Sequence, residues 1–304
     1  MKVAITGASG FLGRYLSSEL TASGHQCRGL IRPTSRHLNP KLPVEWVVGS
    51  LEDPIALNDL VEGADAVIHA ALDHPGGGFL RTGIDVASFV DRNLIGTIRL
   101  IEAAKAAGVG RFVVISSGAV HDEILGDRPL DETHPLWPRT HYGATKAAIE
   151  AFVHSYGRGE KFPICALRPT AIYGLADPLS ESRSYHLIAA VVRGEDVTCR
   201  GGSKQVHAGD VARATQVLLS AKGVAGEVFH CTDLFVADRD VAMIARTIAD
   251  SNGKIQGEAP TSRNPISCEK LRNRGMKFGG QTLLEATIEA MVRATEFEFR
   301  SKSC

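Results

Sequence analysis

Short apolar runs alternate with amphipathic segments along most of the chain. The runs are rich in β-branched residues and contain few polar ones, which is typical of strands buried on both faces of a parallel sheet. The expected strands are Lys2–Thr6, Cys27–Ile31, Val44–Val48, Ala66–Ala71, Arg111–Ile115, Pro163–Arg168 and Glu227–Cys231.

Amphipathic helices are expected between these strands. In the first of them Leu12, Leu16 and Leu20 recur at helical spacing, and Gly24 suits its end. Further helices are expected to begin near positions 54, 90, 141 and 210, with Asp53 as the N-cap of the helix at 54, and a last helix covers about 282–295. Strands that alternate with helices predict an α/β fold with a doubly wound parallel sheet.

The alternation loosens after Tyr173, where turn-forming pairs such as Asp177-Pro178 and Gly201-Gly202 separate shorter elements. The run at 227–231 still reads as a strand of the main sheet. We therefore expect one domain made of residues 1–172 and about 206–234. A smaller, discontinuous C-terminal domain would consist of about 173–205 and 235–304.

A glycine-rich segment, Gly7-Ala8-Ser9-Gly10-Phe11-Leu12-Gly13, joins the first strand to the first helix. Gly7 permits a tight turn, Gly10 lets a pyrophosphate approach the backbone at the helix N-terminus, and Gly13 lets helix and strand pack closely. This context predicts a Rossmann dinucleotide-binding domain. We expect backbone contacts to phosphate from Gly7, Gly10, Phe11 and Leu12.

Arg32 follows the second strand, where dinucleotide-binding folds often carry an acidic residue for the adenosine ribose. The planar guanidinium of arginine binds phosphate, and Ser35 and Arg36 lie near it in sequence. The pattern favours NADP over NAD as the cofactor. A solvated loop is the alternative interpretation of these arginines.

Composition excludes several classes of protein. The 34 basic and 34 acidic residues balance, whereas a nucleic-acid-binding surface usually shows a basic excess. The cysteines are widely spaced and the histidines show no metal-binding spacing, so we expect reduced thiols and no metal. The apolar run at the N-terminus is too short for a signal peptide, and no run could span a bilayer. We expect a cytoplasmic protein without a nucleic-acid or membrane partner.

Several motifs together resemble the extended short-chain dehydrogenase/reductase family, the NAD(P)-dependent epimerases and dehydratases, over nearly the whole chain. They are Thr6–Gly13, Val67–Ala71, Asn93 with Gly96-Thr97, Ser116–Val120, Tyr142–Lys146, Leu167–Thr170 and Val206–Ala212. The resemblance implies an NAD(P)-dependent oxidoreductase or epimerase with a C-terminal substrate domain. It implies that Ser117 hydrogen-bonds the reacting oxygen and that Lys146 also contacts the nicotinamide ribose.

Tyr142 and Lys146 are four residues apart in a helix-forming segment, so they share a face. A free tyrosine has a pKa near 10, and a base useful at pH 7 needs a pKa about 3 units lower, or about 4 kcal/mol of differential stabilisation. The Lys146 ammonium and the positive ring of an oxidised nicotinamide are expected to lower the Tyr142 pKa. Tyr142 is then the acid/base of the reaction, and Ser117, Tyr142 and Lys146 are the predicted catalytic residues.

The remaining cofactor contacts follow from the same resemblance. Small side chains at Ala70 and Ala71 leave room for the cofactor, and Leu51 is expected beside adenine, although Ser50 stands where relatives often have Asp. Asn93 either braces the central strand or touches the ligand. The full set of predicted cofactor-binding residues is Gly7, Gly10, Phe11, Leu12, Gly13, Arg32, Leu51, Ala70, Ala71, Ser116, Tyr142, Lys146 and Arg168.

Departures from the family bear on the reaction. Relatives that act as 4,6-dehydratases usually carry an Asp-Glu pair after the catalytic Ser/Thr, and here Gly118 and Ala119 stand there. Simple hydride transfer remains, by a dehydrogenase or reductase or by an epimerase. A non-catalytic NAD(P)-binding sensor is the rival hypothesis, although such sensors usually lack the Tyr and Lys pair.

The substrate is expected to be a sugar, a sugar derivative or a sugar nucleotide, with a non-sugar carbonyl compound as the alternative. The segment 198–207 looks shortened and lacks the arginine that holds a diphosphate in sugar-nucleotide enzymes, which favours a smaller substrate. The loop at 74–79 is either a lid or an ordinary loop. A homodimer is expected through helices near 91–107 and 142–157. The candidate substrate residues are His74, His121, Arg183 and His207.

Overall fold

The computed structural model describes residues 1–35, 43–73 and 85–302. The chain forms two compact units. The first consists of Met1–Pro169, Val211–Cys231 and Ile266–Met276, and the second of Thr170–Asp210, Thr232–Pro265 and Lys277–Cys304. Residues 266–276 belong to the first unit, and the pattern of apolar residues in the sequence does not predict this.

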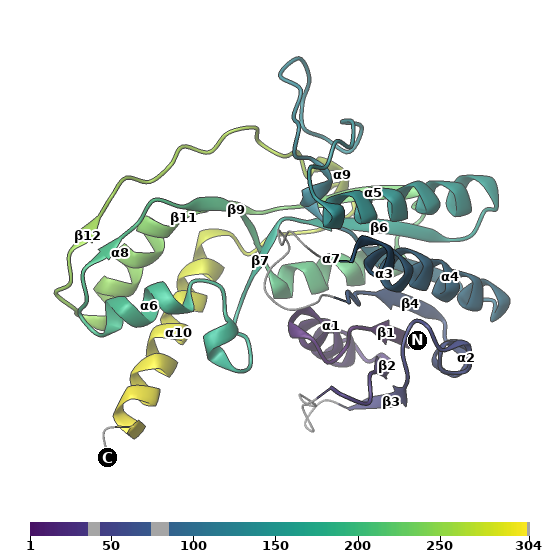
Figure 1. Cartoon of the computed structure of the whole chain (residues 1–304), viewed down its shortest axis with the longest axis horizontal. Helices are drawn as coiled ribbons and strands as arrows, with labels where there is room; N and C mark the ends of the chain where they lie inside the picture. The colour runs from purple at the N-terminus through teal and green to yellow at the C-terminus, as the bar shows by residue number, and fades with distance from the viewer. Residues whose placement is uncertain (36–42, 74–84, 303–304) are drawn as a thin grey trace. The chain divides into compact units, whose positions relative to one another are not determined.

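A seven-stranded sheet in the order β10-β6-β5-β4-β1-β2-β3 forms the centre of the first unit (Figure 1). All neighbouring strands are parallel. The order runs outward from β1 in both directions, which confirms the predicted doubly wound α/β fold. The strands are β1 (Lys2–Thr6), β2 (Gln26–Ile31), β3 (Val44–Val48), β4 (Ala66–His69), β5 (Arg111–Ile115), β6 (Ile164–Pro169) and β10 (Glu227–Cys231).

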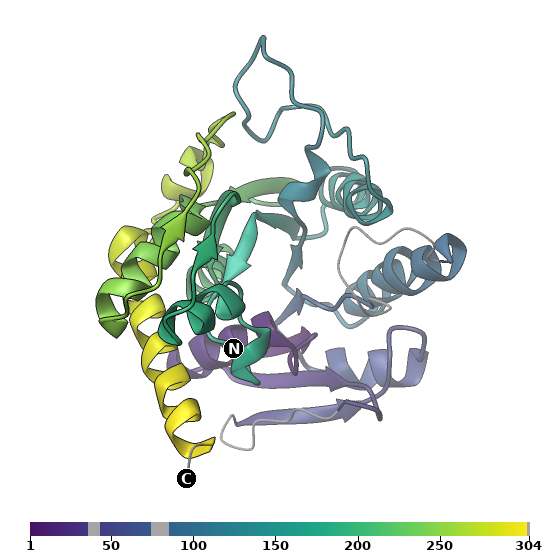
Figure 2. The same cartoon turned by 60° about the vertical axis from the view of Figure 1, so that its left-hand side comes forward.

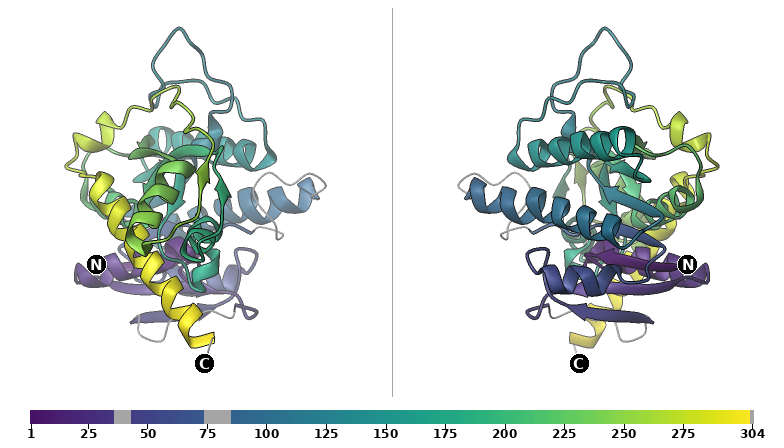
Figure 3. Two further views of the ribbon diagram at one scale, coloured as in Figure 1. Left: turned by 90° about the vertical axis from the view of Figure 1, so that its left-hand side faces the viewer. Right: turned by 90° about the vertical axis from the view of Figure 1, so that its right-hand side faces the viewer.

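Helices cover both faces of this sheet. On one face α2, α4 and α5 lie side by side, as the right-hand view of Figure 3 shows, and they bury Leu57, Leu100 and Ile149 in a core shared with Phe112 of β5. On the other face α7 lies beside α1 (Figure 1), and Gln216 of α7 hydrogen-bonds His25 in the turn after α1 (2.9 Å). The helices are α1 (Phe11–Ala22), α2 (Pro54–Val61), α3 (Val86–Val90), α4 (Gly96–Ala106), α5 (His141–His154), α7 (Ala208–Ser220) and α9 (Glu269–Arg272).

Local sequence explains how one of these helices begins, and another begins earlier than expected. Asp53 caps α2 as predicted, since its Oδ1 accepts from the backbone N–H groups of Ile55 (3.0 Å) and Ala56 (3.2 Å). The helix expected near Val90 starts earlier, at Val86, and passes through a π-helical turn, Asp91–Ile95, before α4. Such turns are rare and often lie at functional sites.

The second unit contains a three-stranded sheet in the order β11-β9-β7 and a two-stranded sheet of β12 and β8. Three helices, α6, α8 and α10, pack against one another and form its apolar core (Figure 2). None of the helices in the described ranges is long and apolar enough to span a membrane. The elements are β7 (Ala171–Tyr173), α6 (Tyr185–Val192), β8 (Val197–Thr198), β9 (Gly202–His207), β11 (Leu234–Ala237), α8 (Asp238–Ala249), β12 (Ile255–Gln256) and α10 (Gly280–Lys302).

Candidate active site

Glycines shape the turn from β1 into α1. Gly7 has φ +74°, in the left-handed region, and a Cβ there would lie 2.8 Å from the backbone of Ala70 and Ala71. A Cβ on Gly13 would lie 2.0 Å from the carbonyl oxygen of Gly7. Gly10 is the N-cap of α1, which has no side-chain cap and no acidic residue in its first turn. This N-terminus therefore fits the pyrophosphate of a dinucleotide.

The three predicted catalytic residues meet at the carboxyl end of β5. Thr140 caps α5 by accepting from the backbone N–H of Gly143 (3.0 Å), and this places Tyr142 and Lys146 on successive turns. Lys146 Nζ donates to the carbonyl oxygen of Ile115 (2.8 Å), the last residue of β5. Ser117 follows β5, and its side chain lies near the Tyr142 phenol, where it favours the phenolate.

A small pocket connects this group with the segment after β4. Its lining residues are His69, Ala71, Leu72, Asn93, Thr97, Tyr142, Thr145, Lys146 and Ile149. The predicted cofactor residue Ala71 therefore lines the same narrow pocket as two predicted catalytic residues, Tyr142 and Lys146.

Burial dominates the protonation of Tyr142 and Lys146. The pKa of Lys146 falls to about 8, because the ammonium is buried, and the nearby Glu150 carboxylate opposes the fall. The pKa of Tyr142 lies above its ordinary value, because burial disfavours the phenolate, and the hydrogen bond from Ser117 opposes the rise. The protein by itself thus shifts the Tyr142 pKa opposite to the expectation from the sequence.

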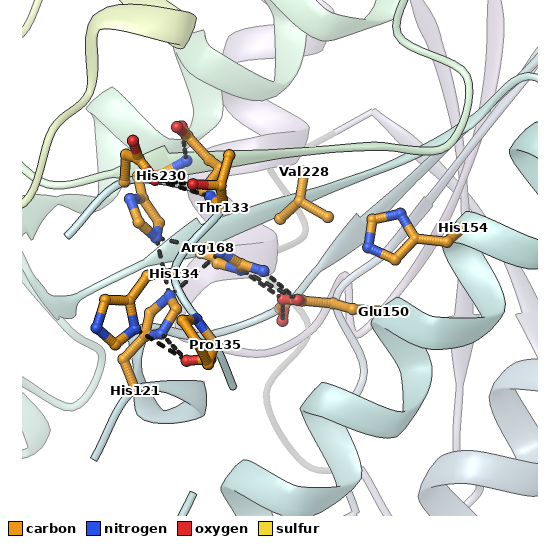
Figure 4. A network of polar contacts seen from close by, with 12 residues as sticks. His121, Thr133, His134, Pro135, Glu150, His154, Arg168, Val228 and His230 are labelled. Atoms are coloured by element: carbon orange, nitrogen blue, oxygen red, sulfur yellow. Dashed lines mark hydrogen bonds and ion pairs between the residues drawn. The ribbon is translucent and has the colours of Figure 1, made fainter. Parts of the chain in front are cut away.

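A buried ion pair lies one helical turn beyond Lys146 (Figure 4). The carboxylate of Glu150 accepts Arg168 Nε (2.9 Å) at Oε1 and Arg168 Nη2 (2.6 Å) at Oε2, and the two side chains are 0 % and 2 % exposed. The hydroxyl of Ser116 also donates to Glu150. This network joins α5, β6 and Ser116, the residue that precedes Ser117. Sequence reasoning missed Glu150, although its spacing from Lys146 was a usable signal.

Two neutral histidines complete the network. Arg168 Nη1 lies 3.2 Å from Nε2 of both His121 and His230, on the side away from Glu150 (Figure 4). Each histidine turns its Nδ1 toward a carbonyl oxygen, His121 to Pro135 (3.2 Å) and His230 to Ser267 (3.2 Å). With Nδ1 as the donor, both Nε2 atoms accept from Arg168. Burial, and then the Arg168 charge, lower the pKa of His121 to about 4 and that of His230 to about 3.

Acidification below pH 6.5 is therefore expected to destabilise the first unit. Since the folded pKa of His230 lies below the ordinary value of 6.5, the unfolded chain binds the proton first, and stability falls between pH 6.5 and about pH 3. His230 is 1 % exposed and accounts for about 3 kcal/mol of this loss at pH 4. His230→Gln should flatten the decline of Tm between pH 6.5 and pH 4, and the exposed control His186→Gln should not. Equal declines in both variants contradict the prediction.

A second set of buried polar contacts holds the segment after β4. His69 Nδ1 lies 2.6 Å from the Thr6 hydroxyl, and its Nε2 lies 2.8 Å from the Thr97 hydroxyl. Asn93 Nδ2 donates to the carbonyl oxygen of Asp73 (3.0 Å), and Asn93 Oδ1 accepts from the Asp73 N–H (2.8 Å). Asn93 therefore braces the segment after β4 through the backbone of Asp73.

Arg32 contributes to an ion pair at the ends of β2 and β4. Its Nη1 lies 2.9 Å from Oδ1 of Asp73, and Arg92 Nε lies 2.5 Å from Oδ2 of the same carboxylate. Leu51 packs against the core beneath this region, where a Cβ on Gly96 would lie 2.9 Å from it. The cofactor contacts assigned to Arg32, Leu51 and Arg168 stay predictions.

The candidate substrate residues fall in different places. His121 lies in the buried network of the first unit. In the second unit, Arg183 Nη2 donates to the Ser203 hydroxyl (3.0 Å), and His207 accepts from the Gly209 N–H (3.0 Å). His74 and the loop at 74–79 lie outside the described residues. Within the described ranges no group of three or more His, Cys, Asp or Glu side chains could hold a metal ion.

Comparisons with known proteins agree on one family. The model of the "NAD dependent epimerase/dehydratase family" matches residues 3–231. A 4-hydroxy-2-methyl-3-oxo-4-farnesyl-3,4-dihydroquinoline-1-oxide ketoreductase of Stigmatella aurantiaca is 32% identical over 77% of this chain and 68% of its own. A dTDP-D-glucose 4,6-dehydratase of Mus musculus is 27% identical over 91% of this chain and 84% of its own.

A solved structure matches the fold over almost the whole chain. The UDP-glucose 4-epimerase of Thermus thermophilus, in complex with NAD, superimposes with a TM-score of 0.78. It is 24% identical in sequence, and the match covers 97% of this chain and 99% of that one. At this level of sequence identity the structural similarity shows the fold alone.

Proposed function

The chain belongs to the NAD-dependent epimerase/dehydratase family of enzymes, and we propose that it moves a hydride between the nicotinamide of NAD(P) and a hydroxyl-bearing or keto carbon. It acts as an oxidoreductase or an epimerase. The observation that carries this proposal is the grouping of Ser117, Tyr142 and the buried Lys146 at the carboxyl end of β5. A non-catalytic sensor would have no need of this arrangement.

Each residue of the group has a separate task in the proposal. Bound NAD(P) supplies or accepts the hydride. Tyr142 takes the proton of the substrate hydroxyl or returns it to the carbonyl oxygen, and Ser117 hydrogen-bonds the same oxygen. Because burial raises the Tyr142 pKa, the phenolate requires positive charge nearby. Lys146 provides one such charge, and the oxidised nicotinamide ring provides another.

Hydride transfer without elimination fits the residues after Ser117. Gly118 and Ala119 lie in a short 3-10 turn, Gly118–Val120, and offer no carboxylate to remove a second proton. We therefore place the chain apart from the 4,6-dehydratases in its reaction. A sugar, a sugar derivative or a sugar nucleotide is the proposed substrate, given the enzymes in the family. Reduction of a non-sugar carbonyl compound is the second candidate, since the Stigmatella relative is named as a ketoreductase.

Replacing Ser117 tests the proposal. Ser117→Ala is expected to lower kcat about 100-fold, because the reacting oxygen loses one hydrogen bond in the transition state. Ser117→Thr keeps the hydroxyl and should retain at least about a tenth of the activity. The assay follows reduced dinucleotide, and separately the interconversion of epimers, with a panel of sugar nucleotides, sugars and simple ketones. Equal activity of the Ala variant and the wild type would remove Ser117 from the mechanism.

The proposal also includes NADP as the preferred cofactor and a cytoplasmic homodimer. Arg32 supports NADP through its position after β2, where the adenosine ribose binds in such folds. Phe152 on α5 is 37% exposed and Ile95 next to α4 is 37% exposed, which leaves apolar surface on the helices expected at the dimer interface. Val153, by contrast, is buried in the core of the first unit.

A further inference from the structure

A carboxylate between two arginines lies beside the predicted adenosine site. Asp73 follows β4, Arg32 follows β2, and Arg92 lies in the π-helical turn before α4. Arg32 and Arg92 bind different oxygens of Asp73, at 2.9 Å and 2.5 Å. The three side chains together carry one net positive charge. They are partly exposed, so an anion arriving from solvent can reach them.

The backbone of Asp73 is clamped, so its carboxylate is restricted in how far it can move. Both of its main-chain polar groups hydrogen-bond the side chain of Asn93, which is 4% exposed and also donates to the carbonyl oxygen of Phe89 (2.9 Å). Arg92 directly precedes Asn93 in the same π-helical turn. One turn of helix therefore holds Asp73 through its backbone and pairs with its carboxylate. Arg32, at 61% side-chain exposure, is the partner free to change direction.

We propose that Asp73 and Arg92 set the dinucleotide specificity of the site. This inference rests on the proposed role of Arg32 at the 2′-phosphate of NADP. The Asp73 carboxylate competes with that phosphate for Arg32 and repels it. When Arg32 turns toward the phosphate, Arg92 stays paired with Asp73. The Asp73 carboxylate therefore keeps one arginine partner after it loses Arg32. Arg92 thereby raises the affinity of the site for NADP without contacting the cofactor, and Asp73 lowers that affinity.

A double-mutant cycle separates this role from a structural one. The measured quantities are the dissociation constants of NADPH and NADH, determined by calorimetry. Arg92→Gln should weaken NADPH about five-fold and NADH less than two-fold, and Asp73→Asn should strengthen NADPH by a similar factor. In the Asp73→Asn background, Arg92→Gln should change NADPH affinity less than two-fold, because the competing carboxylate is gone. Arg99→Gln, which removes another arginine from the same helical segment, is the control for a general loss of positive charge.

The outcomes distinguish this inference from the proposed function. The proposed cofactor role fails if neither dinucleotide binds the wild type, or if Arg32→Ala leaves the ratio of the NADPH and NADH dissociation constants unchanged. In either case the inference fails as well. If Arg32→Ala changes the ratio but Arg92→Gln does not, the inference alone fails. It also fails if the effect of Arg92→Gln persists in the Asp73→Asn background, or if Arg99→Gln has the same effect.

Discussion

Tyr142→Phe is expected to lower kcat about 1000-fold while the dissociation constants of NADH and NADPH change less than about three-fold. The variant loses the single hydroxyl that exchanges a proton with the substrate oxygen. The ring and its packing on α5 stay, and so do the backbone groups of the glycine turn that are expected to bind the dinucleotide. Turnover and cofactor binding therefore separate in this variant.

The comparison needs a tyrosine outside the site. Tyr185 donates its hydroxyl to Glu298 (3.0 Å) within the second unit, and Tyr185→Phe removes one phenol hydroxyl as Tyr142→Phe does. We expect this control to keep at least half of the wild-type kcat. Retention of turnover in Tyr142→Phe would refute Tyr142 as the acid/base, and loss of dinucleotide binding would show that its hydroxyl serves the cofactor instead.

Glu150→Gln is expected to lower the free energy of unfolding by about 3–5 kcal/mol. The carboxylate of Glu150 is the anion beside two buried cations, Arg168, to which it is bound, and Lys146, whose pKa it raises. Gln keeps the size of the side chain and one accepting oxygen but removes the charge. Two desolvated cations then remain without their anion. Urea denaturation at pH 7 measures the loss.

An exposed ion pair supplies the matched control. Glu289→Gln removes a carboxylate that binds Arg293 on the surface of α10, and we expect a loss below about 0.5 kcal/mol. The double variant Glu150→Leu/Arg168→Met should recover part of the lost stability, since an apolar pair of similar volume avoids the desolvation of two charges. A Glu150→Gln protein as stable as the wild type would show that Arg168 finds another partner or stays hydrated.

Patterns in the sequence predict the sheet and the candidate catalytic group because both depend on short spacings. Apolar runs identify the strands, and Asp53 before Pro54 identifies the start of α2. Gly7 is predicted to form a tight turn, and the structure gives it a φ of +74°, in the left-handed region that suits such a turn. A four-residue interval puts Tyr142 and Lys146 on one helix face. The family resemblance adds Ser117, which the structure brings to Tyr142.

Long-range pairings are the part that the sequence does not predict. Arg168 meets Glu150 because α5 packs against β6, and it meets His230 because β10 lies beside β6. Neither pairing leaves a signal in local periodicity. The same holds for Asp73, which reaches Arg32 across the sheet. The direction of the Tyr142 pKa shift was also out of reach, since it depends on how deeply the phenol is buried.

Transfer of an isotope label tests the central claim most directly. The wild type and Tyr142→Phe are incubated with NADPH or NADH that carries deuterium at both C4 positions and with the carbonyl compound that the panel identifies. The account predicts one deuterium at the reduced carbon of the product made by the wild type, and a rate of labelling about 1000-fold lower in the variant. A product without deuterium, or equal labelling by the variant, would contradict hydride transfer at this site.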